Sequence, residues 1–154
     1  MSPVKVLSPA DHVRKNPERY WNGNPSPGAD DVNTAIASQL RDDGCRKIEI
    51  RSRDGWQLVC CELDWAKTMS AQFGNIGRLF EGAVGIPGPV AGGLRVEWFV
   101  ALLASAIRVY VDGHIVYSQG VPDPGFDEGA AYEFQGSVCI AYLLDDRECK
   151  AVHR

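Results

Sequence analysis

Two adjacent cysteines and two nearby carboxylates are the residues whose types and spacing most suggest chemistry. Cys60 and Cys61 end an apolar run, and Glu62 and Asp64 follow directly. Thiolates and carboxylates bind metals and serve as nucleophiles, acids or bases. Adjacent residues of a strand point to opposite faces, so we interpret the two cysteines as buried small side chains rather than as a metal pair. Glu62 and Asp64 leave two interpretations open: solvated residues at a strand end, or carboxylates that line a pocket.

The other residue types that commonly take part in catalysis are scattered along the chain. His12, His114 and His153 are far apart, and none has an acid at the spacing by which a helix presents two metal ligands. The sequence has no GxSxG motif, which marks the nucleophile of many hydrolases. Five cysteines, an odd number without a secretion signal, are typical of reduced thiols in the cytoplasm. We therefore expect no metal and no cofactor.

The composition is that of an ordinary globular domain. The chain has 154 residues, of which 45% are hydrophobic and 23% are charged; one domain of this size buries about two-thirds of its unfolded surface. The net charge is −4, so we do not expect direct nucleic-acid binding, which would need clustered lysine and arginine residues. We interpret Arg14, Lys15 and Arg19 as a solvated helix face. The longest apolar run, 96–111, is interrupted by charged residues, so no membrane span is predicted.

Hydrophobic periodicity predicts both helices and strands. Within 30–43, Val32, Ile36 and Leu40 form the apolar stripe of a helix that ends before Gly44. The same reasoning predicts the remaining elements, namely helices at 11–20, 66–80 and 94–104, and strands at 47–52, 56–63, 107–111, 114–118 and 132–144.

The order of these elements predicts the fold class. Asp54-Gly55 and Asp112-Gly113 each separate two strands and are typical of tight hairpin turns. Together the elements predict an α/β (α+β) two-layer sandwich, with helices on one face of a mixed β-sheet. We expect an N-terminal arm at 1–10, one domain at 11–146 and a C-terminal tail at 147–154. The glycine-rich stretch 82–93 is expected to be a lid or a connector.

Five segments of the chain together carry a family resemblance. They are Val13-Arg14-Lys15-x-Pro17-x-x-Tyr20; the helix ending at Gly44 with 45–50 and the hairpin at Asp54-Gly55; Gly92-Gly93-Leu94 with 99–103; the hairpin 107–118 with 119–122; and 136–142. In this order they resemble VRKRPxMY, the ATP-site helix with its two strands, GGLHGVG…VVNAL, HGVP and GTxVxFxPD. These motifs belong to the N-terminal ATPase domain of the gyrase B subunit and its relatives in the GHKL superfamily. The resemblance covers residues 11–146 and implies a GHKL-like fold.

The resemblance also implies which residues would hydrolyse ATP, and these are replaced. The family's water-activating Glu and Mg²⁺-binding Asn fall on Asp31 and Ala35, or on Asp30 and Thr34 with a one-residue shift. Alanine offers a metal no oxygen. An aspartate carboxylate is set back by about 1.5 Å, where about 1 Å can cost 10²-fold in rate. We therefore expect neither a metal site nor ATP hydrolysis by the family mechanism.

The implied adenine and phosphate contacts are replaced as well. The family's DxGxG corresponds to the strand end 60–65, where Glu62 could stand in for the Asp but no glycine follows. Leu63 and Trp65 would put side chains where the backbone normally approaches the ligand. The GLHGVG glycines fall on 93–98, which adds the acid Glu97 near the expected phosphate position. The implied pocket is lined by Thr34, Ala35, Cys61, Leu63, Trp65, Leu94, Val96, Trp98 and Ser137, with Asp31, Glu62 and Asp64 as candidate catalytic carboxylates.

Three functions remain open from the sequence. The first is a non-hydrolysing GHKL-like domain that binds a small, largely apolar or aromatic metabolite in the former nucleotide pocket. The second is an enzyme that uses the pocket carboxylates as acid and base on an apolar, natural-product-like substrate, helped by desolvation beside Trp65. The third is a protein that interacts with a topoisomerase or mimics gyrase. A homodimer is a further alternative for the assembly.

Overall fold

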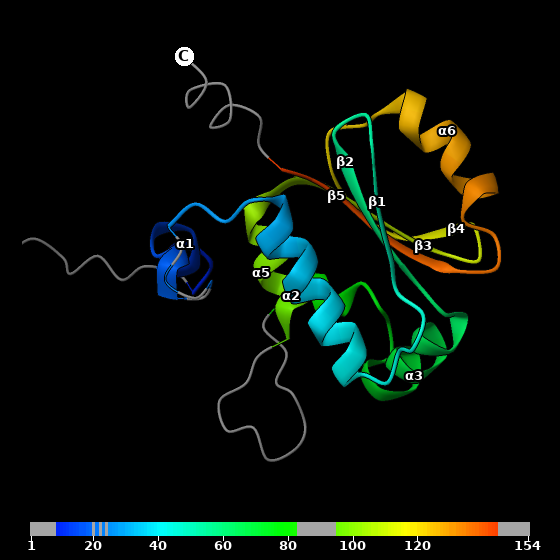
Figure 1. Cartoon of the computed structure of the whole chain (residues 1–154), viewed down its shortest axis with the longest axis horizontal. Coiled ribbons are helices and arrows are strands. Elements are labelled where there is room, and N and C mark those ends of the chain that lie inside the picture. Colours follow the sequence, from blue (N-terminus) through cyan, green and yellow to red (C-terminus); the bar gives the residue numbers. More distant parts are fainter. Residues whose placement is uncertain (1–8, 20, 22, 24, 83–94, 145–154) are drawn as a thin grey trace, which may run out of the picture.

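Helices surround a five-stranded β-sheet in the computed structural model, which describes residues 9–19, 21, 23, 25–82 and 95–144 (Figure 1). The helical elements are α1 (Pro9–Lys15), the 3-10 turn η1 (Pro17–Arg19), α2 (Ala29–Asp42), α3 (Leu63–Phe73), α4 (Arg78–Glu81), α5 (Val96–Leu103) and α6 (Pro124–Glu133). The strands are β1 (Glu49–Arg53), β2 (Trp56–Cys61), β3 (Ala104–Val111), β4 (His114–Gly120) and β5 (Val138–Leu144). Their order across the sheet is β1-β2-β5-β3-β4.

The predicted α/β class, with helices packed against a sheet as in a two-layer sandwich, is confirmed. The strand directions differ from the mixed sheet that we expected, because all four pairings among the described strands are antiparallel. Two of these pairs, β1–β2 and β3–β4, are joined by tight turns that can connect only antiparallel strands. Strand β5 then lies between β2 and β3 and runs antiparallel to both.

Both predicted Asp-Gly turns are confirmed. Asp54 and Gly55 have φ angles of 52° and 88°, and Asp112 and Gly113 have φ angles of 51° and 79°. Two consecutive positive φ angles define the turn whose twist matches that of a hairpin. Aspartate and glycine tolerate this conformation better than other residues, which is why the signal is visible in the sequence.

One face of the sheet packs against α2, α3, α4 and α5 and forms the larger core (Figure 1). The predicted stripe of α2 is confirmed, since Val32, Ile36 and Leu40 are all buried there. Hydrogen bonds then hold α2 against the strands: the Tyr142 hydroxyl donates to Asn33 Oδ1 at 2.6 Å, and Asn33 Nδ2 donates to Gln57 Oε1 at 3.1 Å.

The opposite face of the sheet is covered by α6, which our sequence analysis missed. Glycines at two of its ten positions lower the intrinsic helix propensity. Tertiary contacts compensate: the Asp123 side chain accepts the N–H of Phe126 at the helix start and also accepts the indole N–H of Trp56 at 2.8 Å. The Phe126 ring stacks on that indole at 4.4 Å. Because α6 extends to Glu133, the strand that we expected from residue 132 begins only at Val138.

Other element boundaries differ from the expected ones for local reasons. The first helix begins at Pro9, since proline is well accommodated in the first helical turn. The helix expected at 66–80 begins earlier, at Leu63, which ends β2 at Cys61. It is divided at Gly74, whose φ of 85° ends α3 before α4 begins.

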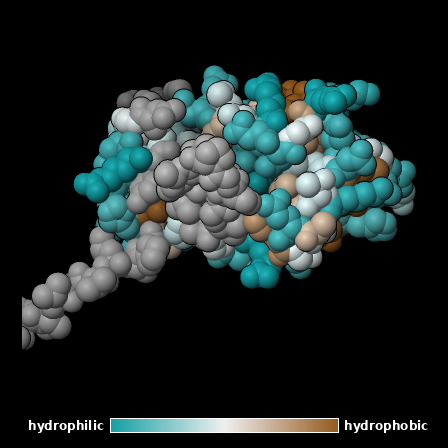
Figure 2. Space-filling model, turned by 90° about the horizontal axis from the view of Figure 1, so that it is seen from below, coloured by the Kyte–Doolittle hydropathy of each residue, from teal (hydrophilic) through white to brown (hydrophobic). Residues whose placement is uncertain are grey.

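Some expectations lie outside the described residues, namely those on the arm at 1–8, on 83–93 and on the tail at 147–154. On the face shown in Figure 2, hydrophobic residues appear in small separate areas among hydrophilic ones. Among the described helices, none combines the length and the apolar character that crossing a membrane requires.

Candidate functional site

Two of the three candidate catalytic carboxylates, Asp31 and Glu62, accept hydrogen bonds from backbone N–H groups. Asp31 is exposed, and its Oδ2 accepts the N–H of Gly28 at 2.9 Å, which closes the first turn of α2. Glu62 Oε1 accepts the backbone N–H groups of Lys47, at 2.7 Å, and of Arg46. These hydrogen bonds, that from Lys47 first, lower the pKa of Glu62. Asp64 is exposed in the first turn of α3.

These carboxylates do not meet at one point. Asp31 lies in the first turn of α2, and a rise of 1.5 Å per residue places Asp42 about 16 Å further along the helix axis. Glu62, in contrast, is bonded to Arg46 and Lys47, which follow the C-terminal end of α2. The geometry therefore does not support the expectation that Asp31 and Glu62 share a pocket as acid and base.

Most candidate ligand-binding residues belong to the larger core. Trp65 and Cys61 are buried in it, and the side chains that pack partly buried against it are Ala35, Leu63, Val96 and Trp98. Thr34 is exposed on α2. Ser137 lies apart from them, before β5, where its hydroxyl donates to the Phe134 carbonyl at 3.4 Å. Leu94 is outside the described residues.

A buried cluster of three charged residues lies beside Trp65 and Val96. Arg95 makes a two-pronged ion pair with Asp43, with Nη1–Oδ1 at 2.8 Å and Nη2–Oδ2 at 2.5 Å. The same Nη2 donates to Glu97 Oε2 at 2.7 Å, and Arg95 Nε donates to that oxygen at 3.2 Å. The Arg95 and Glu97 side chains are each 3% exposed and that of Asp43 is 8% exposed. We refer to these three residues as the Arg95 cluster.

Neighbouring side chains hold the Arg95 cluster in place. The indole N–H of Trp65 donates to Asp43 Oδ2 at 2.9 Å, and Gln39 Nε2 donates to Asp43 Oδ1 at 3.3 Å. The Arg95 guanidinium also lies over the Phe73 ring, 5.4 Å from its centre, where the π-electrons attract the cation. The cluster thus joins the end of α2, helix α3 and the start of α5.

Glu97 is left incompletely satisfied by these contacts. Its Oε1 is buried and has no hydrogen-bond partner among the described residues. Burial raises the pKa of Glu97, and the attraction of Arg95 offsets part of that rise. Burial alone would lower the pKa of Arg95, but its hydrogen bonds and ion pairs with Asp43 and Glu97 have the larger effect and raise the pKa. The guanidinium therefore stays charged. When both acids are ionised, the cluster carries two negative charges and one positive charge, a net charge of −1.

The sequence patterns do not group Arg95, Asp43 and Glu97 together. One signal was present: Glu97 is the charged residue in the otherwise apolar stretch 96–103. Glutamate is rarely buried without a partner, so an acid within a buried helix indicates a paired charge. Nothing in the spacing indicated that Asp43, 52 residues before Arg95, would supply part of that pairing.

The cysteines behave as the sequence predicts, with one addition. Cys60 and Cys61 enter different cores on opposite faces of the sheet. Burial raises the pKa of Cys61, which does not favour it as a nucleophile. The pKa of Cys60 is lowered to about 7 by a hydrogen bond with Cys139 and by Arg51, whose Nη2 lies 3.7 Å from the sulfur. No group of three or more potential metal ligands occurs in the described part of the chain.

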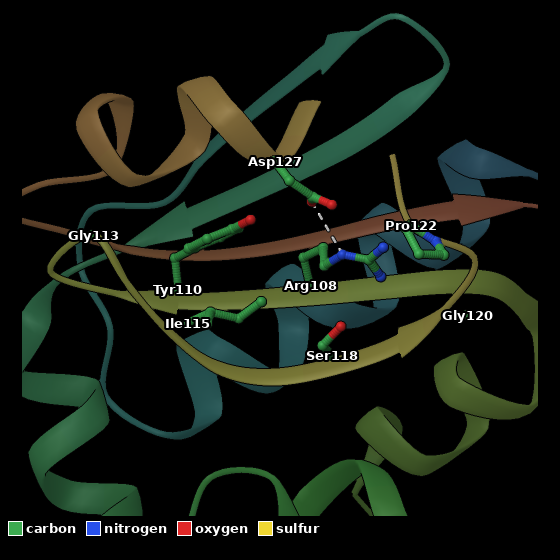
Figure 3. A pocket seen from close by; sticks show the side chains of 8 residues that line it. All are labelled: Arg108, Tyr110, Gly113, Ile115, Ser118, Gly120, Pro122 and Asp127. Atoms are coloured by element: carbon green, nitrogen blue, oxygen red, sulfur yellow. Dashed lines mark hydrogen bonds and ion pairs between the residues drawn. The ribbon is translucent and has the colours of Figure 1, made fainter. Parts of the chain in front are cut away.

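A separate pocket of about 420 Å³ lies on the α6 face of the sheet (Figure 3). It is lined by Arg108, Tyr110, Gly113, Ile115, Ser118, Gly120, Pro122 and Asp127. Arg108 is 2% exposed; it pairs with Asp127 at 3.1 Å and donates to the carbonyl groups of Gln119 and Val121, each at 2.7 Å. Burial and the nearby Asp127 raise the pKa of Tyr110 to about 12. None of the candidate residues from the sequence lines this pocket.

Comparison with known proteins does not add a family to these observations. No family model, no curated protein and no solved structure matches the chain. The resemblance to the GHKL ATPase domains therefore stays a prediction from the sequence motifs.

Proposed function

We propose that this domain binds a small, largely apolar molecule at the Arg95 cluster and does not hydrolyse ATP. The observation that carries the proposal is the buried Glu97 Oε1 without a hydrogen-bond partner among the described residues. An unsatisfied buried polar group costs about 1–3 kcal/mol, and more when it is charged. A bound N–H or O–H group would remove that cost. In native proteins such unsatisfied groups occur at functional or strained positions and at positions that hold a water or an ion.

The surroundings of Glu97 indicate the chemical class of the ligand. The cluster has a net charge of −1 when both acids are ionised, which favours a cationic or hydrogen-bond-donating group over an anion. Trp65, Phe73 and Val96 surround the cluster with apolar surface. A small aromatic amine fits both properties, whereas a nucleotide triphosphate would place negative charge against Glu97. We therefore propose that the ligand is apolar or aromatic, as the sequence predicts, and that it also carries an amine group.

Phenethylamine and 3-phenylpropionate are matched probes of this proposal, because they share a ring and differ in the sign of the charge. At ten times its dissociation constant the amine should stabilise the fold by about 1.4 kcal/mol, an upward shift of about 3–6 °C in melting temperature. The carboxylate and ATP with Mg²⁺ should leave the melting temperature unchanged. The Glu97→Gln variant should lose the response to the amine. Equal stabilisation by both ring compounds, or ATP turnover, would contradict the proposal.

The pH dependence of stability provides a second test of Glu97. Burial raises the pKa of Glu97 above its ordinary value of 4.5, so the folded state holds the proton more tightly than the unfolded chain. The resulting stabilisation is fully present below pH 4.5 and is lost as the pH rises through the folded-state pKa. In urea unfolding from about pH 4 to pH 8, the wild type should therefore lose stability relative to Glu97→Gln. A difference that stays constant over this range would show that Glu97 is not perturbed.

An enzyme remains the alternative, and one observation favours it. A carboxyl group whose pKa is raised by burial can act as a general acid near neutral pH, and Glu97 has that property whereas Glu62 has the opposite one. Binding and catalysis differ in whether the bound amine is recovered chemically unchanged. Mass spectrometry of the probe after prolonged incubation distinguishes them, because binding alone leaves its mass unaltered.

A further inference from the structure

The two edges of the sheet differ in how they are protected from other strands. Strand β1 is one edge, and three of its five residues are charged: Glu49, Arg51 and Arg53. Strand β4 is the other edge, and its sequence, HIVYSQG, contains no lysine, arginine, aspartate or glutamate. Edge strands present unpaired N–H and C=O groups, and charged side chains normally discourage pairing with another strand. That protection is present on β1 and absent from β4.

The pocket on the α6 face lies directly beside the β4 edge, where the β3–β4 register shifts between Val109 and Tyr110. Figure 3 shows Ile115 and Ser118 on β4 at its rim, with Arg108 and Tyr110 of β3 behind them. Ile115 is 52% exposed. A strand added alongside β4 would present alternate side chains to this same face of the sheet. The pocket could thus take one side chain while the backbone of β4 pairs with the added strand, the arrangement by which strand addition achieves both affinity and specificity.

The charge of this region indicates the partner. Residues 108–144 contain five acids, Asp112, Asp123, Asp127, Glu128 and Glu133, and one cation, Arg108, a net charge of −4 from one cation and five anions. Nearby arginines neutralise two of them: Arg108 pairs with Asp127, and Arg51 and Arg53 pair with Glu133. A second copy of the chain would bring a like-charged region against this one, whereas a basic segment is complementary to it.

We propose that β4 and the adjoining pocket form a strand-addition site for a basic, extended peptide segment of a partner protein. The segment pairs its backbone with the free edge of β4. Its lysine or arginine side chains are attracted by two exposed acids, Asp112 in the turn before β4 and Glu128 on α6. This site lies on the opposite face of the sheet from the Arg95 cluster, so it is independent of the function proposed above.

Fluorescence anisotropy with a labelled peptide of alternating lysine and valine residues tests this site. The peptide should bind with a Kd below about 1 mM, a weak affinity of about 4 kcal/mol, and binding should weaken as salt is added. A peptide of alternating glutamate and valine should not bind. The Ile115→Lys variant should reduce affinity at least tenfold. Ile50→Lys on β1 is the matched control, since Ile50 is 47% exposed on the other edge, and it should bind as the wild type does.

Further variants test whether a loss of peptide binding comes from the β4 edge itself. If Ile115→Lys unfolds, Ser118→Lys replaces it, because Ser118 is exposed on the same strand. Glu97→Gln should leave peptide binding unchanged, which separates this site from the Arg95 cluster. Equal binding of the two peptides, an equal loss in Ile50→Lys, or sedimentation showing a dimer that Ile115→Lys dissociates would each overturn the proposal. The last result would assign the edge to a second copy of the chain.

Discussion

Replacing Arg95 with methionine should lower the free energy of unfolding by about 3–5 kcal/mol, because it leaves two buried carboxylates without their partner. Asp43 and Glu97 are 8% and 3% exposed, and Arg95 contacts both. Methionine fills a similar volume, so the loss reports charge rather than a cavity. The effect should shrink toward acidic pH, where Glu97, whose pKa is raised by burial, takes up a proton. Urea unfolding at several pH values measures both the size of the loss and this trend.

Two comparisons separate a buried charge effect from a general effect of removing arginine. Arg51→Met removes a side chain that is 42% exposed and pairs with Glu49 at 3.3 Å; exposed pairs contribute at most about 1 kcal/mol, so little change is expected. The double variant Arg95→Met with Glu97→Leu removes one of the stranded charges and should recover part of the lost stability. A loss for Arg95→Met no larger than that for Arg51→Met would show that the cluster is solvated rather than buried.

Replacing Gly120 with alanine should be similarly damaging, for steric reasons. Gly120 has a φ of +88°, and a Cβ there would lie 2.2 Å from the Ser105 carbonyl oxygen and 2.7 Å from the Ala106 Cα. Both obstructing atoms belong to the backbone of β3, so the contact cannot be relieved by the rotation of a side chain. Strain from the left-handed conformation and from overpacking together predicts a loss of about 2–5 kcal/mol. Thermal unfolding followed by circular dichroism measures it.

Gly136 provides the matched control for that substitution. Its φ of +79° is close to that of Gly120, but no atom lies within 4 Å of a Cβ built on it. Gly136→Ala should therefore cost only the conformational strain, about 1–2 kcal/mol. The difference between the two variants isolates the close approach of the β3 and β4 backbones. Equal losses in the two variants would mean that the strands can separate to admit a methyl group without cost.

Stability and binding should respond in opposite directions at Glu97. Burial disfavours the ionised form of Glu97, and Glu97→Gln removes that charge, so the variant should be at least as stable as the wild type at neutral pH. The same change should abolish the response to the amine. A residue whose replacement stabilises the fold while removing a function is typical of a binding site. Arg95→Met, in contrast, should weaken the fold without removing the carboxylate that the amine contacts.

Local sequence patterns were sufficient for the elements that depend on neighbouring residues. The two Asp-Gly turns follow from the preference of these residues for positive φ, and helix α2 follows from the spacing of Val32, Ile36 and Leu40. The opposite orientation of Cys60 and Cys61 follows from the two-residue period of a strand. Each of these depends on geometry within a few residues, which the order of amino acids determines by itself.

What only the tertiary structure decided depends on residues distant in the chain. Helix α6 contains Gly125 and Gly129 and forms because Trp56, 67 residues before Asp123, bonds to its cap. The Arg95 cluster likewise joins Asp43 to Arg95 across 52 residues. A linear pattern cannot indicate which distant charges burial will bring together, because pairing depends on how α2, α3 and α5 pack. The candidate site is therefore centred on Glu97 rather than on Asp31 and Glu62, because its buried Oε1 has no hydrogen-bond partner within the part of the chain that the structure describes.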